Sequence, residues 1–297
     1  MPRFQDLCNK YNIKPTYLVT SEVCDDDFAK EIFSDYSISN KAEIGAHLHS
    51  WTTPPFTDRD GYRYNDPNHA FATELDEGIL NEKILHLTNQ IEDSFGKRPL
   101  SFRSGRYGFN GDVARVLVRN SYLVDSSVTP YVDWSAHKGM PGGKGGPNYI
   151  ANTPFPFDYY FDSGSLLEIP ITILPTKFPL NLNKTIAEKY FKSVNNNPFL
   201  RVLRKAIYKN QPLWLRPNIW MDINQFEVLL NEAIKIKLPY IVMMFHSSEL
   251  MPGCSAYRPD EKSIDELFNL LESFFSLVQN KNIGSVTLTE AGKSFKL

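Results

Sequence analysis

The sequence predicts a single α/β domain of the barrel type, and three observations support this prediction. Short apolar stretches rich in β-branched residues recur along the 297 residues, and stretches with helical hydrophobic period separate them. Strands that alternate with helices of this length form parallel sheets through βα units. An undivided α/β barrel commonly reaches this length.

The elements are predicted in order along the chain from these patterns. Predicted strands cover residues 15–20, 42–49, 100–107, 122–128, 166–173, 213–216, 240–246 and 284–288. Predicted helices cover residues 3–12, 76–95, 111–120, 184–194, 224–237 and 263–280. The run 240–245 is apolar throughout, which is typical of a strand covered on both faces. Residues 52–68 and 134–160 have the composition of long ordered loops, which are commonly functional in compact domains.

Composition disfavours several classes of protein. A net charge of −2 favours neither nucleic acid nor an anionic membrane as a partner. The three cysteines, Cys8, Cys24 and Cys254, lack the spacing of a disulfide framework or a thiolate zinc site. No stretch approaches the ~18 consecutive apolar residues of a membrane span, and no signal pattern opens the chain, so a cytoplasmic protein is predicted.

Two of the six histidines, His47 and His49, lie at the end of the second predicted strand. Side chains two residues apart in a strand point to the same face, roughly 6.5–7 Å apart. Both imidazoles could therefore reach one metal ion. The alternative is a pair of polar residues at a strand end, bonded to solvent or to the backbone.

Other chemically capable side chains also fall at predicted strand ends, where α/β barrels carry their functional residues. These are Arg103 and Arg106, Asp125, and His246. His246 is the strongest candidate, because a buried imidazole needs partners for both of its nitrogens. Arg103 is equally compatible with a structural arginine at the barrel mouth. Asp125 is more readily explained as closing the loop that follows it.

Taken in order, these segments resemble the NodB-homology polysaccharide deacetylases, carbohydrate esterase family 4. The likeness is greatest to the branch associated with lipopolysaccharide and O-antigen biosynthesis. Glu-Ile-Gly-Ala-His, ending at His47, is similar to the second family motif. Residues 102–108 resemble the third, Arg-x-Pro-Tyr-Gly, with one extra residue and no proline. Residues 125–134 resemble the fourth motif, and Phe245-His246 the fifth.

The resemblance implies a distorted (β/α) barrel and a metal-dependent hydrolase. The implied substrate is an N-acetylated sugar of a surface polysaccharide or lipopolysaccharide precursor. It assigns His47 and His49 to a divalent metal ion, expected to be zinc. It implies that Arg103 orients the catalytic base, that the backbone of Tyr107 binds the oxyanion, and that His246 is the general acid. Because of the extra residue in the third motif, Arg106 remains an alternative to Arg103.

The sequence departs from the family pattern in two further ways. Trp51 stands where the family's His-x-x-x-His pattern has its second histidine, so His49 is expected to replace it. The family's first motif, an Asp-Asp pair on a strand before the first helix, has no counterpart, since that helix begins at Met1. The acidic residues 25–27 are instead typical of a helix start. The barrel is therefore expected either to lack its first strand through truncation or to belong to a degenerate family member.

Three functions remain in competition at this point. The first is the deacetylase, and the second is a non-catalytic glycan-binding or regulatory protein on the same fold, suggested by the missing Asp pair. The third is a hydrolase of another amide, such as a cyclic ureide or a peptide, because a fold does not fix its substrate.

Overall fold

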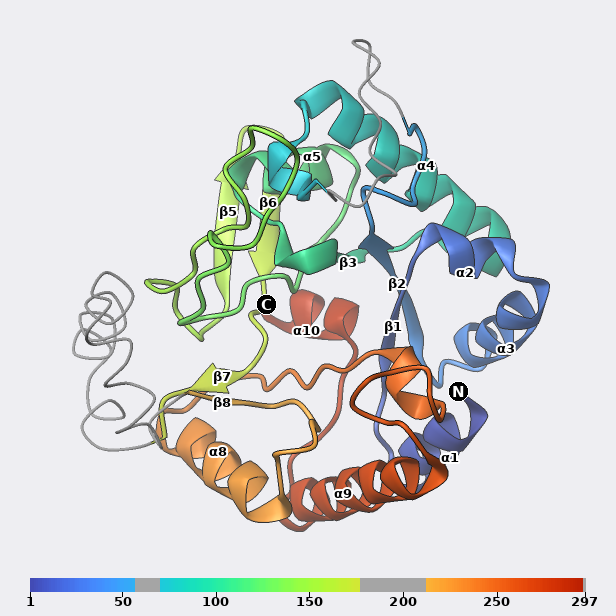
Figure 1. The fold of residues 1–297 in the computed structure, drawn as a ribbon, viewed down its shortest axis with the longest axis vertical. Helices are drawn as coiled ribbons and strands as arrows, with labels where there is room; N and C mark the ends of the chain where they lie inside the picture. The colour runs from blue at the N-terminus through green and yellow to red at the C-terminus, as the bar shows by residue number, and fades with distance from the viewer. Residues whose placement is uncertain (57–69, 177–211, 296–297) are drawn as a thin grey trace.

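The computed structural model describes residues 1–56, 70–176 and 212–295 and confirms the predicted α/β class (Figure 1). A six-stranded sheet has the order β1-β2-β3-β4-β6-β5. All neighbouring pairs are parallel except β5 with β6, and β7 pairs with β8 in a separate antiparallel sheet. The strands are β1 (Thr16–Val19), β2 (Glu43–Leu48), β3 (Ser101–Ser104), β4 (Val124–Asp125), β5 (Phe157–Phe161), β6 (Gly164–Glu168), β7 (Ile173–Leu174) and β8 (Leu213–Trp214).

Helices surround these strands, and α10 lies near the middle of the view in Figure 1. They are α1 (Pro2–Lys10), α2 (Ser21–Asp25), α3 (Asp27–Ile38), α4 (Glu77–Phe95), α5 (Gly111–Arg119), α8 (Ile223–Lys235), α9 (Glu261–Asn280) and α10 (Leu288–Phe295). Short 3-10 turns are η1 (Ala72–Glu74), η2 (Gly105–Tyr107) and η3 (Ser247–Leu250). Within the described ranges, no helix has the length and apolar content that a bilayer crossing requires.

The longest apolar face among the first helices belongs to α4 and follows from its sequence. Ile84, Leu87 and Ile91 are spaced by three and four residues, so they lie on one face, and all three are fully buried. The Asp76 side chain accepts a hydrogen bond from the first turn, and Gly96 ends the helix in the left-handed conformation, with φ of 69°. Helix α4 therefore packs its apolar face against the sheet.

The structure of residues 240–246 differs from the predicted buried strand. The segment is extended but forms no regular ladder: its backbone bonds run from Thr172 N to Val242 O and from Met244 N to Leu215 O. Both bonds lie on the side of β7 and β8, and within residues 240–245 only Met244 is buried. The expectation of a strand covered on both faces is therefore wrong, because the described residues supply a hydrogen-bonded neighbour on one side alone.

Other boundaries also differ from the predictions. The predicted strand 284–288 does not form: residues 284–287 are irregular, and α10 begins at Leu288. The predicted loop 134–160 contains most of β5, which pairs with β6 along its whole length. Helix α3 was not predicted, although Asp26 caps it by accepting a bond from Ala29 N, as the acidic cluster indicates. The predicted helix 184–194 and most of the loop 52–68 lie outside the described residues.

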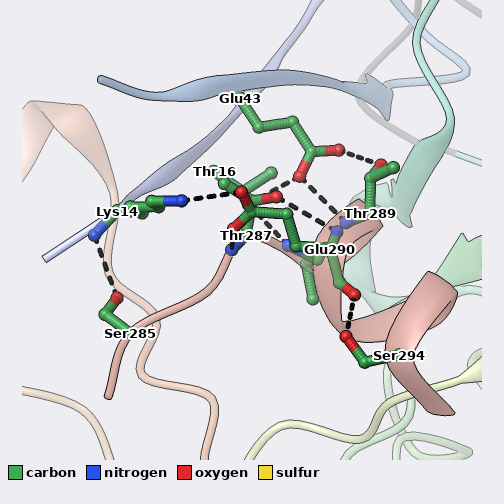
Figure 2. A network of polar contacts seen from close by, with 9 residues as sticks. Lys14, Thr16, Glu43, Ser285, Thr287, Thr289, Glu290 and Ser294 are labelled. Carbon is green, nitrogen blue, oxygen red and sulfur yellow. Dashed lines mark hydrogen bonds and ion pairs between the residues drawn. The ribbon is translucent and has the colours of Figure 1, made fainter. Parts of the chain in front are cut away.

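The amino end of β2 is tied to α10 by a polar network (Figure 2). The Glu43 carboxylate accepts hydrogen bonds from the Thr16 and Ser101 hydroxyls and from both the backbone N–H and the hydroxyl of Thr289. The Thr16 hydroxyl in turn accepts from Leu288 N. One carboxylate thus joins β1, β2, β3 and the start of α10, at the strand end opposite to His47.

Candidate functional site

The predicted site residues gather at the carboxyl ends of the parallel strands. His47 lies opposite Arg103 in the pairing of β2 with β3, and Asp125 lies opposite Glu168 in the pairing of β4 with β6. His246 follows the extended segment beside β8, and its charge acts on His47. The fold therefore brings the candidate side chains of separate segments to one edge.

His47 is held as a neutral imidazole with a defined tautomer. Its Nδ1 lies 2.9 Å from the carbonyl oxygen of Arg103. A carbonyl can only accept, so Nδ1 carries the hydrogen and the Nε2 lone pair remains for a ligand. Burial lowers the pKa of His47 to about 3, and the neighbouring His49 adds to this effect. A hydrogen bond of this kind is typical of metal-binding histidines.

His49 lies beside His47, as the strand spacing predicts, and also packs on Trp51. The two histidine rings are 4.6 Å apart between centroids with an interplanar angle of 65°. The rings of His49 and Trp51 stack at 4.4 Å and 17°. Trp51 thus supports the His49 ring from the position at which the family has its second histidine.

Within the described residues the donor set falls short of a catalytic metal centre. Zinc sites of that kind use three protein ligands, and His47 and His49 would supply two. Within residues 1–56, 70–176 and 212–295, no group of three His, Cys, Asp or Glu side chains is placed to hold an ion. The charge of Glu22, in the first turn of α2, acts on His49 without making such a group.

Arg103 and Arg106 have different surroundings. Arg103 is 8% exposed and donates from Nε to the backbone oxygen of Ser126 at 2.6 Å and from Nη2 to its hydroxyl at 2.9 Å. Arg106 points away, donates to the carbonyl of Lys138, and lies 4.0 Å from the centroid of the Phe71 ring. The structure therefore favours Arg103 as the arginine of the site and gives Arg106 contacts with a loop.

A carboxyl pair lies buried next to Arg103. Asp125 accepts from the backbone N–H and the hydroxyl of Ser127, both at 2.8 Å, and so closes the loop that follows it. Glu168 accepts from Val128 N through Oε1, whereas its buried Oε2 meets no donor in the described part of the chain. Burial and the neighbouring Asp125 raise the pKa of Glu168 well above its ordinary value. The charge of Arg103 acts in the opposite direction and lowers the pKa of both carboxyl groups.

The backbone at Tyr107 is held in a strained conformation. Arg106 and Tyr107 have φ of 54° and 60°, a left-handed region that costs such residues of the order of 1–3 kcal/mol each. The Tyr149 hydroxyl lies 2.6 Å from the carbonyl oxygen of Tyr107 and 2.9 Å from that of Phe109, and fixes this turn. The Tyr107 ring stacks on Trp134 at 5.2 Å, so an aromatic wall borders the turn.

His246 is bound by a carboxylate from its own turn. The Glu249 Oε1 lies 3.1 Å from His246 N, 3.2 Å from His246 Nδ1 and 2.9 Å from Arg216 Nη2. The Glu249 side chain is 1% exposed, whereas that of His246 is 56% exposed. Burial alone would raise the pKa of Glu249, but the bonds from His246 and the charge of Arg216 lower it to about 2. The outer edge of the imidazole therefore remains accessible.

The loop after the histidines is anchored by a buried lysine. Lys83 of α4 is fully buried and donates to the carbonyl oxygens of Ser50, Thr53 and Pro55 at 2.9, 2.5 and 2.5 Å. Burial lowers the pKa of Lys83 to about 8. The three carbonyls favour the protonated form, so the ammonium ties the segment that follows His49 to α4.

The glycine-rich loop is wrapped around a carboxylate of η1. Glu74 accepts from Met140 N at 3.0 Å and Gly145 N at 2.9 Å. A side chain at Gly139 or Gly143 would collide with the same carboxylate, and Gly145 adopts φ of +77°. The glycines are therefore explained by this close approach.

Sequence reasoning missed several of these residues. Glu249, Arg216, Tyr149 and Glu74 each act through contacts that the chain's linear pattern does not display. Only Glu249 has a local signal, because it lies three residues after His246, where a 3-10 turn returns its carboxylate to the turn's first residue.

Comparison with known proteins supports the fold. No protein-family model and no curated protein matches the sequence. The solved structure of Puue allantoinase has a TM-score of 0.52 and 15% identity, over 98% of this chain and 70% of that one. A CE4 family pseudoenzyme from Bacillus anthracis has a TM-score of 0.44 and 11% identity, over 97% and 59% of the two chains.

A further similar structure is the CE4 domain of a multidomain xylanase from the hindgut metagenome of Trinervitermes trinervoides. Its TM-score is 0.43 at 10% identity, over 98% of this chain and 82% of that one. The chain spans between 46% and 61% of the length of four of the structures to which it is similar. At these identities the similarity to the allantoinase shows a shared α/β fold and nothing more specific.

Proposed function

We propose that this protein is an amide hydrolase that removes the acetyl group from an N-acetylated sugar of a surface polysaccharide or lipopolysaccharide precursor. The observation that carries the proposal is the accessible imidazole of His246, held by Glu249 at the same edge as His47. A histidine positioned in this way can donate a proton to a departing amine. The aromatic wall beside Tyr107 suits the apolar face of a sugar ring.

The remaining roles follow from the surroundings of each side chain. The backbone of Tyr107 is proposed to contact a developing oxyanion, and the buried positive charge of Arg103 beside it supports this role. His47 and His49 are proposed as ligands of a divalent ion, for which zinc is the first choice. Because the described residues supply only two ligands, water activation is not assigned to a metal.

A second candidate is a glycan-binding protein without turnover on the same fold. The observation that favours it is the incomplete donor set around His47 and His49 within the described residues. Hydrolysis of a cyclic ureide is a third candidate, since the structure with a TM-score of 0.52 is an allantoinase.

The test measures acetate release from a chitin oligosaccharide and ring opening of allantoin, with and without added zinc. We expect acetate release by the wild-type protein and a loss of 100-fold or more, the scale of a missing general acid, in His246→Ala. The matched control is His86→Ala, an exposed histidine on α4 that should retain full activity. Sugar binding by calorimetry without acetate release would favour the second candidate, and ring opening of allantoin alone would favour the third.

A further inference from the structure

The contacts of Glu249 define how the His246 ring is presented. A carboxylate oxygen can only accept, and Glu249 Oε1 lies 3.1 Å from the His246 backbone nitrogen and 3.2 Å from its Nδ1. The ring and the backbone of one residue are thus bonded to the same oxygen. This double attachment restrains rotation of the ring, because η3 fixes the carboxylate relative to the backbone.

Arg216 determines the charge of this arrangement. Its Nη2 donates to Glu249 Oε1 at 2.9 Å and also lies 3.4 Å from His246 Nδ1. Nδ1 cannot accept from Arg216 and donate to Glu249 at once. An unprotonated Nδ1 would place its lone pair against the carboxylate, so the hydrogen lies on Nδ1 and is directed at Glu249. Arg216 therefore acts on the carboxylate, which it keeps ionised although the side chain is buried.

Among the residues that the structure describes, no other carboxylate accepts a hydrogen bond from the His246 ring. Asp125, in the stretch that resembles the fourth family motif, is committed to Ser127 and Glu168. Asp133, in the same stretch, accepts a hydrogen bond from Ser135 N. The partner of His246 is therefore supplied by its own turn.

We propose that Glu249 and Arg216 are positioning residues that fix His246 as the Nδ1–H tautomer and present its Nε2 to the substrate. The role of the presented Nε2 as a proton carrier rests on the function proposed above. The tautomer and the ring orientation do not depend on that function, so they can be measured even if the protein releases no acetate.

The decisive measurement is nitrogen NMR of the histidine rings at a pH where His246 is neutral. In the wild-type protein we expect His246 to be the Nδ1–H form, and in Glu249→Gln we expect the ratio of the two tautomers to fall by about tenfold, the effect of one charge-assisted hydrogen bond. Glu31→Gln, an exposed carboxylate on α3, is the matched control and should leave the ratio unchanged. A His246 ring that is the Nε2–H form in the wild-type protein, or an unchanged ratio in Glu249→Gln, would overturn the proposal.

Kinetics separate this proposal from the function on which it rests. If the wild-type protein releases acetate, Glu249→Gln should lower kcat by about 10- to 100-fold with little change in KM, because the buried Glu249 carboxylate is proposed to act through His246 and not on the sugar. Arg216→Gln should also lower kcat. Part of this loss in kcat should be recovered at higher pH, because Glu249 is then ionised even without the charge of Arg216. Urea unfolding checks whether each variant is folded. If a variant is not folded, the tautomer of His246 in the wild-type protein still decides the proposal. Wild-type protein without acetate release, but with the Nδ1–H tautomer, would refute the deacetylase and leave the positioning role supported.

Discussion

Substitution of Glu43 by glutamine tests whether the amino end of β2 stabilises the fold separately from the candidate site at its carboxyl end. The Glu43 carboxylate receives four hydrogen bonds on two oxygens, of which Figure 2 shows those from Thr16 and Thr289. Glutamine has nearly the same shape but keeps one acceptor oxygen, and its amide group turns donors towards two of the four partners. Two of the four hydrogen bonds are therefore lost. The hydroxyl or N–H groups that donated them then face the N–H groups of the glutamine amide.

The expected cost is about 2 kcal/mol of unfolding free energy, at roughly 1 kcal/mol for each lost bond. For a chain of 297 residues that corresponds to a fall in Tm of about 3 °C, because the unfolding entropy is about 2.1 cal/mol/K per residue. The assay is urea unfolding, in which the midpoint should fall without a change in slope. Because His47 lies four residues along the strand, roughly 13 Å away, zinc and sugar binding should stay at wild-type values.

The control is Glu31→Gln, which removes an exposed carboxylate on α3 and should change stability by less than about 0.5 kcal/mol. A Glu43→Gln protein as stable as this control would show that the network does not hold α10 to the sheet. A stable Glu43→Gln protein with weakened zinc or sugar binding would refute the separation of the two strand ends.

Three further predictions concern other parts of the molecule. Lys83→Met should cost about 3 kcal/mol in urea unfolding because it leaves three loop carbonyls without their donor; a cost below about 0.5 kcal/mol would contradict the clamp. Glu249 is ionised in the folded protein down to a pKa of about 2 and takes up its proton near 4.5 when unfolded, so stability present above pH 4.5 is lost as the pH falls towards 2. That loss approaches about 3 kcal/mol and should be missing from Glu249→Gln; identical pH curves would count against it. In hydrogen exchange, the amides of Ile241, Met243 and Phe245, which form no hydrogen bond within the described residues, should exchange at least about tenfold faster than the bonded amides between them. Equal protection would reveal a neighbour on that side.

The parallel core could be predicted from the sequence because its signals are local. Apolar, β-branched runs at 15–20, 42–49 and 100–107 contain β1, β2 and β3, and the intervening helical period gives α4. Strand β5 could not be found in this way, because Phe157–Phe161 has no buried residue and depends on pairing with β6. The run 240–246 has the composition of a buried strand, yet composition does not reveal whether neighbours exist on both sides.

The positions of the candidate site residues could be predicted from the sequence, but the role of each side chain could not. His47 and Arg103 lie side by side because parallel strands align their carboxyl ends, whereas His246 reaches the same region from a segment that is not a strand of the sheet. The choice between Arg103 and Arg106 depends on backbone φ values in η2, which turn the second arginine towards Lys138. Sequence spacing alone contains no information about that turn.

The histidine pair shows why spacing predicts proximity but not coordination. The two-residue period of a strand puts His47 and His49 on one side, and their rings do lie 4.6 Å apart. Ring orientation is set by other neighbours: the Arg103 carbonyl fixes His47, and Trp51 stacks on His49. A metal ion also needs a third ligand from elsewhere in the fold, and only tertiary structure can bring one there. Zinc binding by the pair would therefore have to compete with the Trp51 stack, so Trp51→Ala should alter zinc affinity only if His49 is a ligand.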